Sequence, residues 1–436
     1  MGDRSIQNQE PRTRDDKEDV DNGSYDYSPN RGTALVATSD VLADWSDTVG
    51  TLWCPIRLQT YVEPPSAWDF FQRQVSCSRP CLIHGAIVDE SNSTEPLHLS
   101  LDDLLQLISE QAEVSANLTI TVNITPDGHG DCLRKVRKRQ SFNSETNRTN
   151  DTSIASTIDV EEEILMFVKP LECQMTLREF QEHLRTQSKY PTKDKTEIQN
   201  RVFDLVGKDK TVNKEGASSD SVPYLDGVVY YSHQNDCLRQ QLEPLWNASS
   251  NGGTNKRIFP TNFDWAQQAF EAAEPEAINL WVGNEHAVSS MHKDPYENLF
   301  YVLSGEKVFT VCPPSDAPFL YERPFPSGSF VYHDGKWKVQ AETEPCPDDP
   351  TVHQPTMVRW IAADVTQPEQ DTFPLLQHCH PLRVTVRAGQ LLYLPALWFH
   401  KVEQTCETVG LNYWYDMKFD SPLWCYFHLL QQLQPT

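Results

Sequence analysis

The chain has 436 residues, of which 38% are hydrophobic and 30 are prolines, and its formal net charge is -25. This length is enough for one large domain or two to three ordinary ones, and the proline content predicts that part of the chain is unstructured. The acidity argues against non-specific binding to nucleic acid or to an anionic membrane, because such binding needs a basic face. A cationic partner suits this charge better.

Neither a secretory signal nor a membrane span is visible in the sequence. The N-terminus lacks an apolar segment, and no apolar run reaches the ~20 residues that cross a bilayer. The eleven cysteines are scattered and odd in number, as expected of reduced thiols rather than a disulfide framework. These features predict a cytoplasmic protein that can also be nuclear, with neither a membrane nor a nucleic acid as partner.

Polarity divides the chain into a tail, a domain and two insertions. Residues 1–50 are acidic, polar and poor in aromatic side chains, so we expect a disordered N-terminal tail. We expect one domain over residues 51–436, with polar insertions at about 134–160 and 189–221. The first insertion opens with the basic run RKVRKR and is interpreted as a solvated loop.

Helical spacing of apolar residues marks the helices. Ser66 is suited to cap a helix over Ala67–Val75. A second helix is predicted over Ser100–Gln111, where leucines and an isoleucine make one apolar stripe. TLREFQEHLRTQ predicts a third helix between the two insertions, and PLWCYFHLLQQLQ predicts an amphipathic helix near the C-terminus.

The C-terminal helix has two interpretations. Leu423, Trp424, Phe427 and Leu430 recur at three- to four-residue spacing, so they share one face. This face can pack on the helix's own domain, which is the usual arrangement, or on a second copy of the chain in a homodimer.

The rest of the chain, and its C-terminal half above all, is predicted to be mainly β. Short apolar or alternating runs are separated by Gly and Pro turns, a pattern typical of a barrel or sandwich. The runs are PCLIHGAI, ANLTITVNITPDG, GVVYYSH, AINLWVG, NLFYVLSG, KVFTVCP, LRVTVRAGQLLYLPALWFHKVEQ and ETVGLNYWYDM.

Two His-x-Asp pairs occur in the sequence, and about one is expected by chance. His129 and Asp131 follow the turn TPDG, so we interpret that pair as part of a surface loop. His292 and Asp294 precede the run NLFYVLSG. Either they face water at a strand edge, or they are metal ligands on one side of a strand, since side chains two residues apart share a face.

His400 is the candidate for a third ligand. It ends the run GQLLYLPALWFH, far along the chain from His292 and Asp294. Two histidines and one carboxylate bind Fe(II) on one side and leave open positions on the other, an arrangement that suits oxygen activation. A histidine at the end of a strand is, however, more often structural than a ligand.

Three further polar residues interrupt apolar runs. Lys307 opens KVFTV, and is either a solvated lysine at a strand edge or a charge that binds the distal carboxylate of a dicarboxylate. Asn298 and Asn412 lie in YENLFYV and VGLNYWYD. A buried Asn must form hydrogen bonds, which either a structural network or a polar cosubstrate can supply.

Two clusters compete for a metal or redox role. His378, Cys379 and His380 form QHCHPL, but the second, separated ligand pair of a typical zinc site is missing, so a polar turn is the better interpretation. Cys77 and Cys81 in CSRPC lack the CxxC spacing, which argues against a disulfide or reactive pair.

Together these segments resemble the Jumonji-C (JmjC), cupin-like family of Fe(II)- and 2-oxoglutarate-dependent oxygenases. The resemblance is densest over INLWVGNEHAVSSMHKDPYENLFYVLSGEKVFTVCPPSDAPF, VRAGQLLYLPALWFHKVEQ and LNYWYDMKFD. It covers residues 51–436 apart from the two insertions. It implies a mainly β fold, a double-stranded β-helix or jelly roll with flanking helices.

The resemblance also implies roles for individual residues. His292, Asp294 and His400 match the iron ligands, and Lys307 matches the lysine that pairs with a carboxylate of 2-oxoglutarate. The remaining matches line the cosubstrate pocket, and Ser289 stands where many relatives have Thr: Ser289, Asn298, Tyr230 and Asn412.

The activity implied is hydroxylation coupled to oxidative decarboxylation of 2-oxoglutarate, with O2 as the second cosubstrate. By resemblance the target is C3 of a lysine in a developmentally regulated GTP-binding protein. Three alternatives stay open: a related hydroxylase of another target (asparagine, arginine or a tRNA base), a histone lysine demethylase, or a cupin-like binding module that has lost activity. The same resemblance makes a homodimer plausible.

Overall fold

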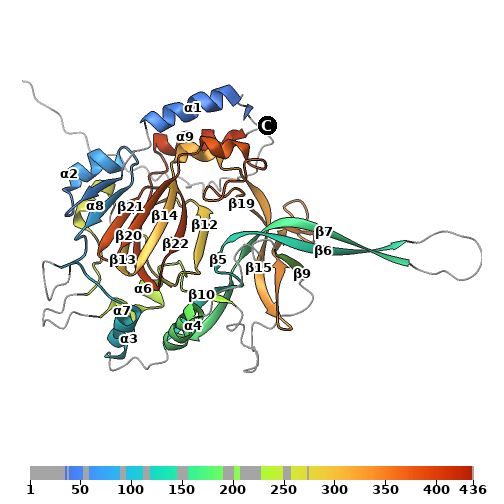
Figure 1. The fold of residues 1–436 in the computed structure, drawn as a ribbon, viewed down its shortest axis with the longest axis horizontal. Coiled ribbons are helices and arrows are strands. Elements are labelled where there is room, and N and C mark those ends of the chain that lie inside the picture. The colour runs from blue at the N-terminus through green and yellow to red at the C-terminus, as the bar shows by residue number, and fades with distance from the viewer. Residues whose placement is uncertain are drawn as a thin grey trace, which may run out of the picture.

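The computed structural model describes most of the chain and places two sheets face to face at its centre (Figure 1). No helix among the described residues has the length and apolar character needed to span a bilayer. The described residues are 35–36, 39–52, 58–88, 95–110, 118–144, 156–189, 201–206, 227–248, 257–272 and 274–434.

The central sheets form the jelly roll that was predicted. The larger sheet has six strands in the order β11-β23-β13-β21-β3-β2, and the smaller has five in the order β20-β14-β22-β12-β5. In these orders the strands are β11 Ala277–Gly283, β23 Thr408–Asp416, β13 Tyr296–Ser304, β21 Gln390–Leu394, β3 Cys81–His84, β2 Gln59–Tyr61, β20 Leu382–Arg387, β14 Glu306–Cys312, β22 Phe399–Gln404, β12 Val288–His292 and β5 His129–Gly130.

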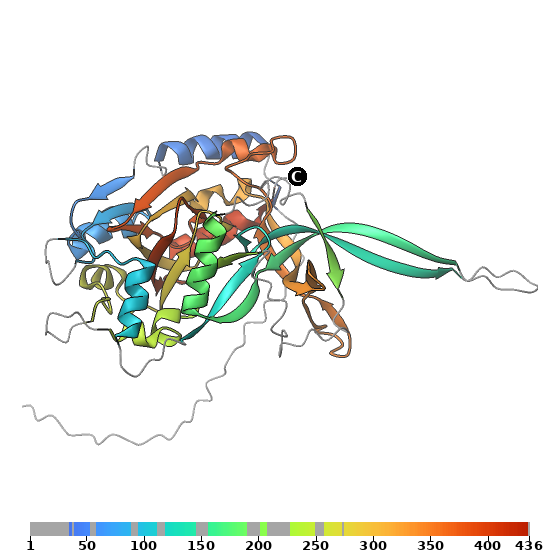
Figure 2. The ribbon, with the colours of Figure 1, turned by 60° about the horizontal axis from the view of Figure 1, so that its bottom comes forward.

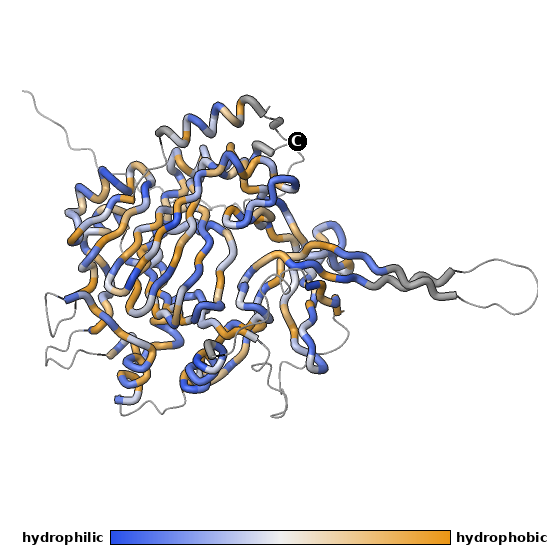
Figure 3. The backbone as a smooth tube through the Cα atoms, viewed as in Figure 1, coloured by the Kyte–Doolittle hydropathy of each residue, from blue (hydrophilic) through white to orange (hydrophobic). Residues whose placement is uncertain are grey.

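The larger sheet is buried on both faces. Phe300, Val302 and Leu392 project from it into the space between the sheets, where they meet Phe309 and Val402 of the smaller sheet. The opposite face packs against helices, so its strands are almost continuously hydrophobic. Figure 3 shows hydrophobic residues recurring along the strands of both sheets. Burial on both sides gives the site strands a rigid support.

Three helices of the body lie where their sequences predicted them, whereas the three short helices between residues 237 and 270 were not predicted. Ser66 caps α2 by accepting a hydrogen bond from the Asp69 amide, and Ser100 and Asp103 form a capping box on α3. The flanking helices are α2 Ala67–Phe70 with the π-helical turn η1 Phe71–Val75, α3 Leu101–Ser109, α4 Leu177–Lys189, α6 Cys237–Gln240, α7 Glu243–Trp246 and α8 Asp264–Phe270.

A third large sheet stands beside the jelly roll. Its order is β16-β9-β6-β7-β15-β19, and a separate three-stranded sheet, β10-β4-β8, contacts this sheet through β15 and also contacts helix α4. The strands are β16 Lys336–Ala341, β9 Val202–Val206, β6 Cys132–Ser144, β7 Ser156–Lys169, β15 Glu322–His333, β19 Met357–Ile361, β10 Val228–Tyr230, β4 Thr119–Thr125 and β8 Leu171–Thr176.

The prediction of a solvated loop over 134–160 is wrong for its described residues. Strands β6 and β7 form a long antiparallel hairpin that projects from the body (Figures 1 and 2). Arg137 faces Glu163 and Lys138 faces Glu162 across it, so opposite charges stabilise a pairing that a polarity argument counts as loop. Residues 145–155 lie outside the described residues.

The second predicted insertion, 189–221, also contains a strand. Within it β9 pairs in parallel with β6 and with β16, so this segment belongs to the third sheet. Phe203 of β9 is buried in the main core, next to Phe330. The remainder of the insertion from residue 190 lies outside the described residues.

The predicted disordered tail ends too late in the sequence, because helix α1 spans Ser39–Leu52. Trp45 donates its indole N–H to the Ser315 carbonyl (3.2 Å), and Ser46 donates to the His378 carbonyl (2.9 Å). The Trp45 ring also lies 5.9 Å from that of Tyr426. These contacts attach α1 to the body. Residues 1–34 and 37–38 lie outside the described residues.

The C-terminal helix α9, Pro422–Gln432, packs on its own chain. Phe427 and Leu430 are buried in a cluster with Phe399 of β22. Leu429, on another face, is 53% exposed. The intramolecular arrangement therefore accounts for the buried face of the helix, and dimerisation stays a prediction.

Candidate metal centre and cosubstrate pocket

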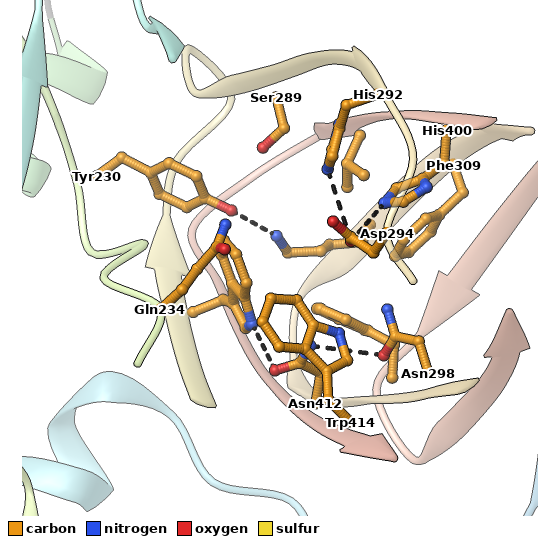
Figure 4. A pocket seen from close by; sticks show the side chains of 14 residues that line it. Tyr230, Gln234, Ser289, His292, Asp294, Asn298, Phe309, His400, Asn412 and Trp414 are labelled. Carbon is orange, nitrogen blue, oxygen red and sulfur yellow. Dashed lines mark hydrogen bonds and ion pairs between the residues drawn. The ribbon is translucent and has the colours of Figure 1, made fainter. Parts of the chain in front are cut away.

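Three candidate metal ligands meet at the end of β12. His292 is the last residue of that strand, Asp294 follows two residues later, and His400 lies directly opposite His292 on antiparallel β22 (Figure 4). The Asp294 carbonyl accepts the Leu397 amide at 2.9 Å, which ties the turn after β12 to the segment that leads into β22. Strand pairing thus brings together residues that are distant in the sequence.

The geometry of these three side chains suits one shared ion. The Asp294 carboxylate lies 3.9 Å from Nε2 of His292 and 3.5 Å from Nε2 of His400. The three ligand atoms all lie within 4.8 Å of one another, and among the described residues they form the one such group of His, Cys, Asp and Glu side chains. Two imidazoles and one carboxylate are the ligand set of non-haem Fe(II) oxygenases.

The hydrogen bonds of both imidazoles prepare them to bind a metal. Nδ1 of His292 lies 2.7 Å from the Ser290 carbonyl, and Nδ1 of His400 lies 2.9 Å from the Trp398 carbonyl. A carbonyl can only accept, so each Nδ1 carries the proton and each Nε2 offers its lone pair to the centre. Burial and the neighbouring His400 lower the pKa of His292 to about 4, which keeps its ring neutral.

The carboxylate is held in its ionised form. Burial alone would raise the pKa of Asp294, but the neighbouring His400 and His292 side chains lower it below its usual value. Two neutral imidazoles and an ionised carboxylate are the protonation states that a metal ligand set requires. The residues present therefore fit Fe(II).

Below these ligands the jelly roll encloses a pocket of about 360 Å³, its open mouth included. All eight residues that the family resemblance assigned to the metal and cosubstrate sites line this pocket, and they come from both central sheets and from β10 (Figure 4). The full lining is Tyr230, Gln234, Trp281, Ser289, His292, Asp294, Asn298, Phe300, Lys307, Phe309, His400, Val402, Asn412 and Trp414.

Lys307 is a buried cation within this pocket. It is 1% exposed, and its ammonium donates to the Tyr230 hydroxyl at 2.8 Å. The rings of Phe300, Tyr230 and Trp281 lie 5.2, 5.3 and 5.6 Å from its Nζ. Among the described residues no carboxylate forms an ion pair with it, and burial lowers its pKa to about 7. A ligand carboxylate would supply the missing counter-charge.

The remaining polar residues of the pocket are joined by hydrogen bonds. Asn412 accepts the indole N–H of Trp281 at 3.0 Å and donates to the Asn298 side chain at 3.5 Å. Burial raises the pKa of Tyr230, and a hydrogen bond with Ser289 opposes that shift. Hydroxyl and amide groups therefore surround the space between Lys307 and the metal ligands.

Sequence reasoning missed several residues that shape the site. Gln234 lies in the loop after β10 and Trp414 lies on β23, where it stacks on Tyr296 at 4.8 Å. Trp360 of β19 lies parallel to the His292 ring, with 6.2 Å between ring centroids. Single aromatic residues in strands give no local signal that separates a pocket wall from an ordinary core.

The prediction that the first His-x-Asp pair belongs to a surface loop is wrong. His129 pairs with Val288, so β5 extends the smaller sheet alongside β12. Burial raises the pKa of Asp131 to about 6, and the Asp131 carbonyl accepts the hydroxyl of Ser290. The turn before His129 directs the chain back along β12 instead of into solvent.

Neither competing cluster forms a metal site or a disulfide in the described part of the chain. His380 donates its amide to Asp316 at 2.6 Å, and its Nδ1 lies 2.9 Å from the same carboxylate. This pair braces the segment on which α1 packs. Cys77 is exposed and Cys81 is buried, and both are free thiols.

Comparison with known proteins agrees with this geometry. A family model described as a cupin-like domain matches residues 67–421. JmjC domain-containing protein E of Dictyostelium discoideum is 29% identical over 387 residues, which cover 85% of this chain and 87% of that protein.

Two further relatives carry activities in their names. The bifunctional peptidase and (3S)-lysyl hydroxylase JMJD7 of Homo sapiens is 28% identical over 401 residues, 92% of this chain and 96% of that protein. The lysine-specific demethylase JMJ32 of Arabidopsis thaliana is 39% identical over 217 residues, 47% of this chain and 57% of that protein. With its jelly roll and its His-Asp-His site, the chain belongs to the JmjC, cupin-like oxygenase family.

Proposed function

We propose that the protein is an Fe(II)- and 2-oxoglutarate-dependent hydroxylase of a lysine side chain in another protein. The observation that carries this proposal is the presence of two complementary sites in one pocket. One is a metal ligand set of His292, Asp294 and His400, and the other is the buried ammonium of Lys307, which has no carboxylate partner among the described residues.

Each group has a defined task in such a reaction. His292, Asp294 and His400 would hold Fe(II), which when bound supplies the activation of O2 that is coupled to oxidative decarboxylation of 2-oxoglutarate. Lys307 and the Tyr230 hydroxyl bind the distal carboxylate of the cosubstrate and fix its orientation. Ser289, Asn298 and Asn412 offer polar contacts along its length.

The walls of the pocket exclude water from the reacting groups. Phe300, Phe309, Trp281 and Val402 line it between the two sheets. In such a medium the attraction between Lys307 and a carboxylate is stronger than in water. The substrate side chain reaches the centre from the mouth, where His292 and Asp294 retain partial exposure.

Lysine is the target supported by the relatives. The human relative is named as a (3S)-lysyl hydroxylase and the Arabidopsis relative as a lysine-specific demethylase. The net charge of -25 also favours a cationic substrate. We propose C3 of a lysine in a developmentally regulated GTP-binding protein as the hydroxylated position.

Mass spectrometry tests this proposal. Wild-type protein and His292→Ala are incubated with Fe(II), 2-oxoglutarate, O2 and the GTP-binding protein, and succinate is measured in parallel. We expect wild type to add one oxygen atom to a lysine with matching release of succinate, and the variant to do neither. Succinate release with no modified lysine would reject the target, and absence of both would reject the activity.

A lysine demethylase is the second candidate, because the Arabidopsis relative has the highest identity of the three compared, over about half of this chain. The same metal ligands would serve demethylation, because an N-methyl group that has been hydroxylated leaves as formaldehyde. A methyl-lysine peptide separates the two functions. Loss of a methyl group with formaldehyde release would favour the demethylase, whereas oxygen retained on the lysine carbon chain favours the hydroxylase.

A further inference from the structure

The third sheet has a partly exposed apolar face that leads to the metal centre. Cross-strand partners point to the same side of a sheet, and residues two apart on a strand share that side. Leu133 pairs with Phe167, Ser327 with Phe167, and Phe325 with Val358. We call this side the docking face; its apolar residues are Leu133, Leu165, Phe167, Phe325, Val358 and Trp360.

The opposite side of the same sheet is part of the protein core. Val136, Met166, Phe330 and Val339 are buried there in the main hydrophobic cluster. The docking-face residues belong to none of the three buried clusters found among the described residues. Leu165 is 39% exposed, Leu133, Val358 and Trp360 are half-buried, and Phe167 and Phe325 are buried beneath them. The accessible part of the face is therefore made by Leu165, Leu133, Val358 and Trp360.

The docking face is continuous with the metal ligands. The Phe167 and Trp360 rings lie 4.5 Å apart, and Trp360 lies parallel to His292, with 6.2 Å between centroids and an interplanar angle of 3°. Strand β19, which carries Trp360, lies beside β12 in Figure 1. A polypeptide bound on this face would therefore run beside the metal ligand His292.

Two cations border the docking face. Lys135 faces Leu165, and Arg323 faces Trp360, with its guanidinium 5.1 Å from the Phe325 ring. Both are exposed, and neither is in an ion pair with another described residue. Apolar surface with two separate unpaired cations suits a polypeptide that presents an apolar side chain. A nucleic acid would require a continuous basic surface.

We propose that the docking face binds the extended segment of the protein substrate that carries the target lysine, and that Trp360 determines its specificity. This rests on the proposed hydroxylation of a protein lysine. Two residues of extended chain span roughly 6.6 Å at ~3.3 Å each, close to the 6.2 Å between Trp360 and His292. A side chain two positions from a lysine held at the metal, on the same side of the peptide, would therefore come within reach of Trp360.

Peptide binding tests this proposal without requiring turnover. Two fluorescein-labelled peptides carry one central lysine and differ only at the positions two residues from it, which are Leu in one and Ser in the other. Their affinities are measured by anisotropy against the full chain loaded with Mn(II) and N-oxalylglycine, an unreactive analogue of 2-oxoglutarate. We expect wild type to bind the Leu peptide about tenfold more tightly.

Three variants identify the residue responsible. Trp360→Ala should reduce the Leu preference to less than about twofold, and Leu165→Ser, at a site exposed enough to keep the fold, should weaken both peptides by about two- to threefold. Trp68→Ala is the matched control, since Trp68 is 64% exposed and stacks on Phe71 of η1, in a part of the structure remote from β19 (Figure 1). It should retain the full preference.

Several results would overturn the proposal. Binding of neither peptide to wild type, an undiminished Leu preference in Trp360→Ala, or displacement of the Leu peptide by an RNA oligonucleotide would each do so. If Trp360→Ala lost Mn(II) affinity and peptide affinity to the same extent, Trp360 would only position His292, and its role in specificity would be rejected. A Leu preference that depends on Trp360 without any hydroxylation would instead keep the docking face and reject the hydroxylase.

Discussion

His292 and His400 face each other across two antiparallel strands, with 4.2 Å between their ring centroids, although they lie far apart in the sequence. Each is held by a carbonyl two residues before it on its own strand segment. The metal site is thus specified by strand register, and a shift by one residue would turn one imidazole away. The buried sheets behind it keep this register fixed.

Removal of one ligand should abolish tight metal binding. His400→Ala leaves one imidazole and one carboxylate, and we expect Mn(II) affinity to fall by at least roughly 100-fold. Calorimetric titration of the metal-free protein measures this. His333→Ala, which removes an exposed imidazole in β15, should leave the affinity unchanged; an equal loss in both variants would contradict the assignment.

Lys307→Met should make the protein more stable and unable to bind 2-oxoglutarate. The substitution removes a buried ammonium whose burial is unfavourable, so we expect the free energy of unfolding to rise by about 1–3 kcal/mol. Urea denaturation measures the change, and ligand-induced shifts in melting temperature report binding. Lys336 is an exposed lysine in β16, so Lys336→Met should change neither the stability nor the binding of 2-oxoglutarate. A destabilised Lys307→Met that still binds the cosubstrate would refute the role of Lys307.

Binding of 2-oxoglutarate should weaken as the pH rises above neutrality. The pKa of Lys307 is about 7 in the free protein, and a bound carboxylate favours the charged form and raises it. The affinity is then greatest below about pH 7 and falls by roughly tenfold per pH unit above it, until the pKa of the complex is reached. Calorimetry at pH 6.5, 7.5 and 8.5 measures this dependence. A constant affinity would show that Lys307 does not titrate in this range.

The ion pair beside the ligands should stabilise the metal site. Lys293, between His292 and Asp294, reaches Glu322 at 2.6 Å, and Gln431 of α9 donates to the same carboxylate at 3.1 Å. Glu322 is 8% exposed, so Glu322→Gln leaves a partly buried cation unpaired, and we expect a loss of about 2–3 kcal/mol in stability.

Urea denaturation and Mn(II) titration check this prediction, because Glu322→Gln should lower both the free energy of unfolding and the affinity for Mn(II). Glu271→Gln removes one partner of the exposed pair with Lys418 and is the control, for which we expect no measurable change in either. Unchanged metal affinity in Glu322→Gln would show that the pair acts on the fold alone.

The sequence predicted the jelly-roll strands because their apolar runs are long and punctuated by turns. The position of α1 could also have been predicted, since Leu42, Trp45, Val49 and Leu52 recur at helical spacing within the acidic segment. The acidic composition of the surrounding residues outweighed that periodicity in our prediction.

The remaining differences come from long-range pairing. The hairpin of β6 and β7 depends on cross-strand charge pairs such as Arg137 with Glu163, which neither segment shows alone. Pairing of β5 with β12 places the His129 segment beside the site. The contact of Trp360 with His292 joins two sheets, and no local pattern encodes it.

Calorimetric titration of 2-oxoglutarate into the protein with and without Mn(II) shows whether the metal ligands and Lys307 bind the same molecule. We expect one bound 2-oxoglutarate per chain in the presence of metal, and a large loss of affinity when Mn(II) is omitted, in His400→Ala and in Lys307→Met. Equal affinity with and without Mn(II), or undiminished binding to Lys307→Met, would contradict this expectation.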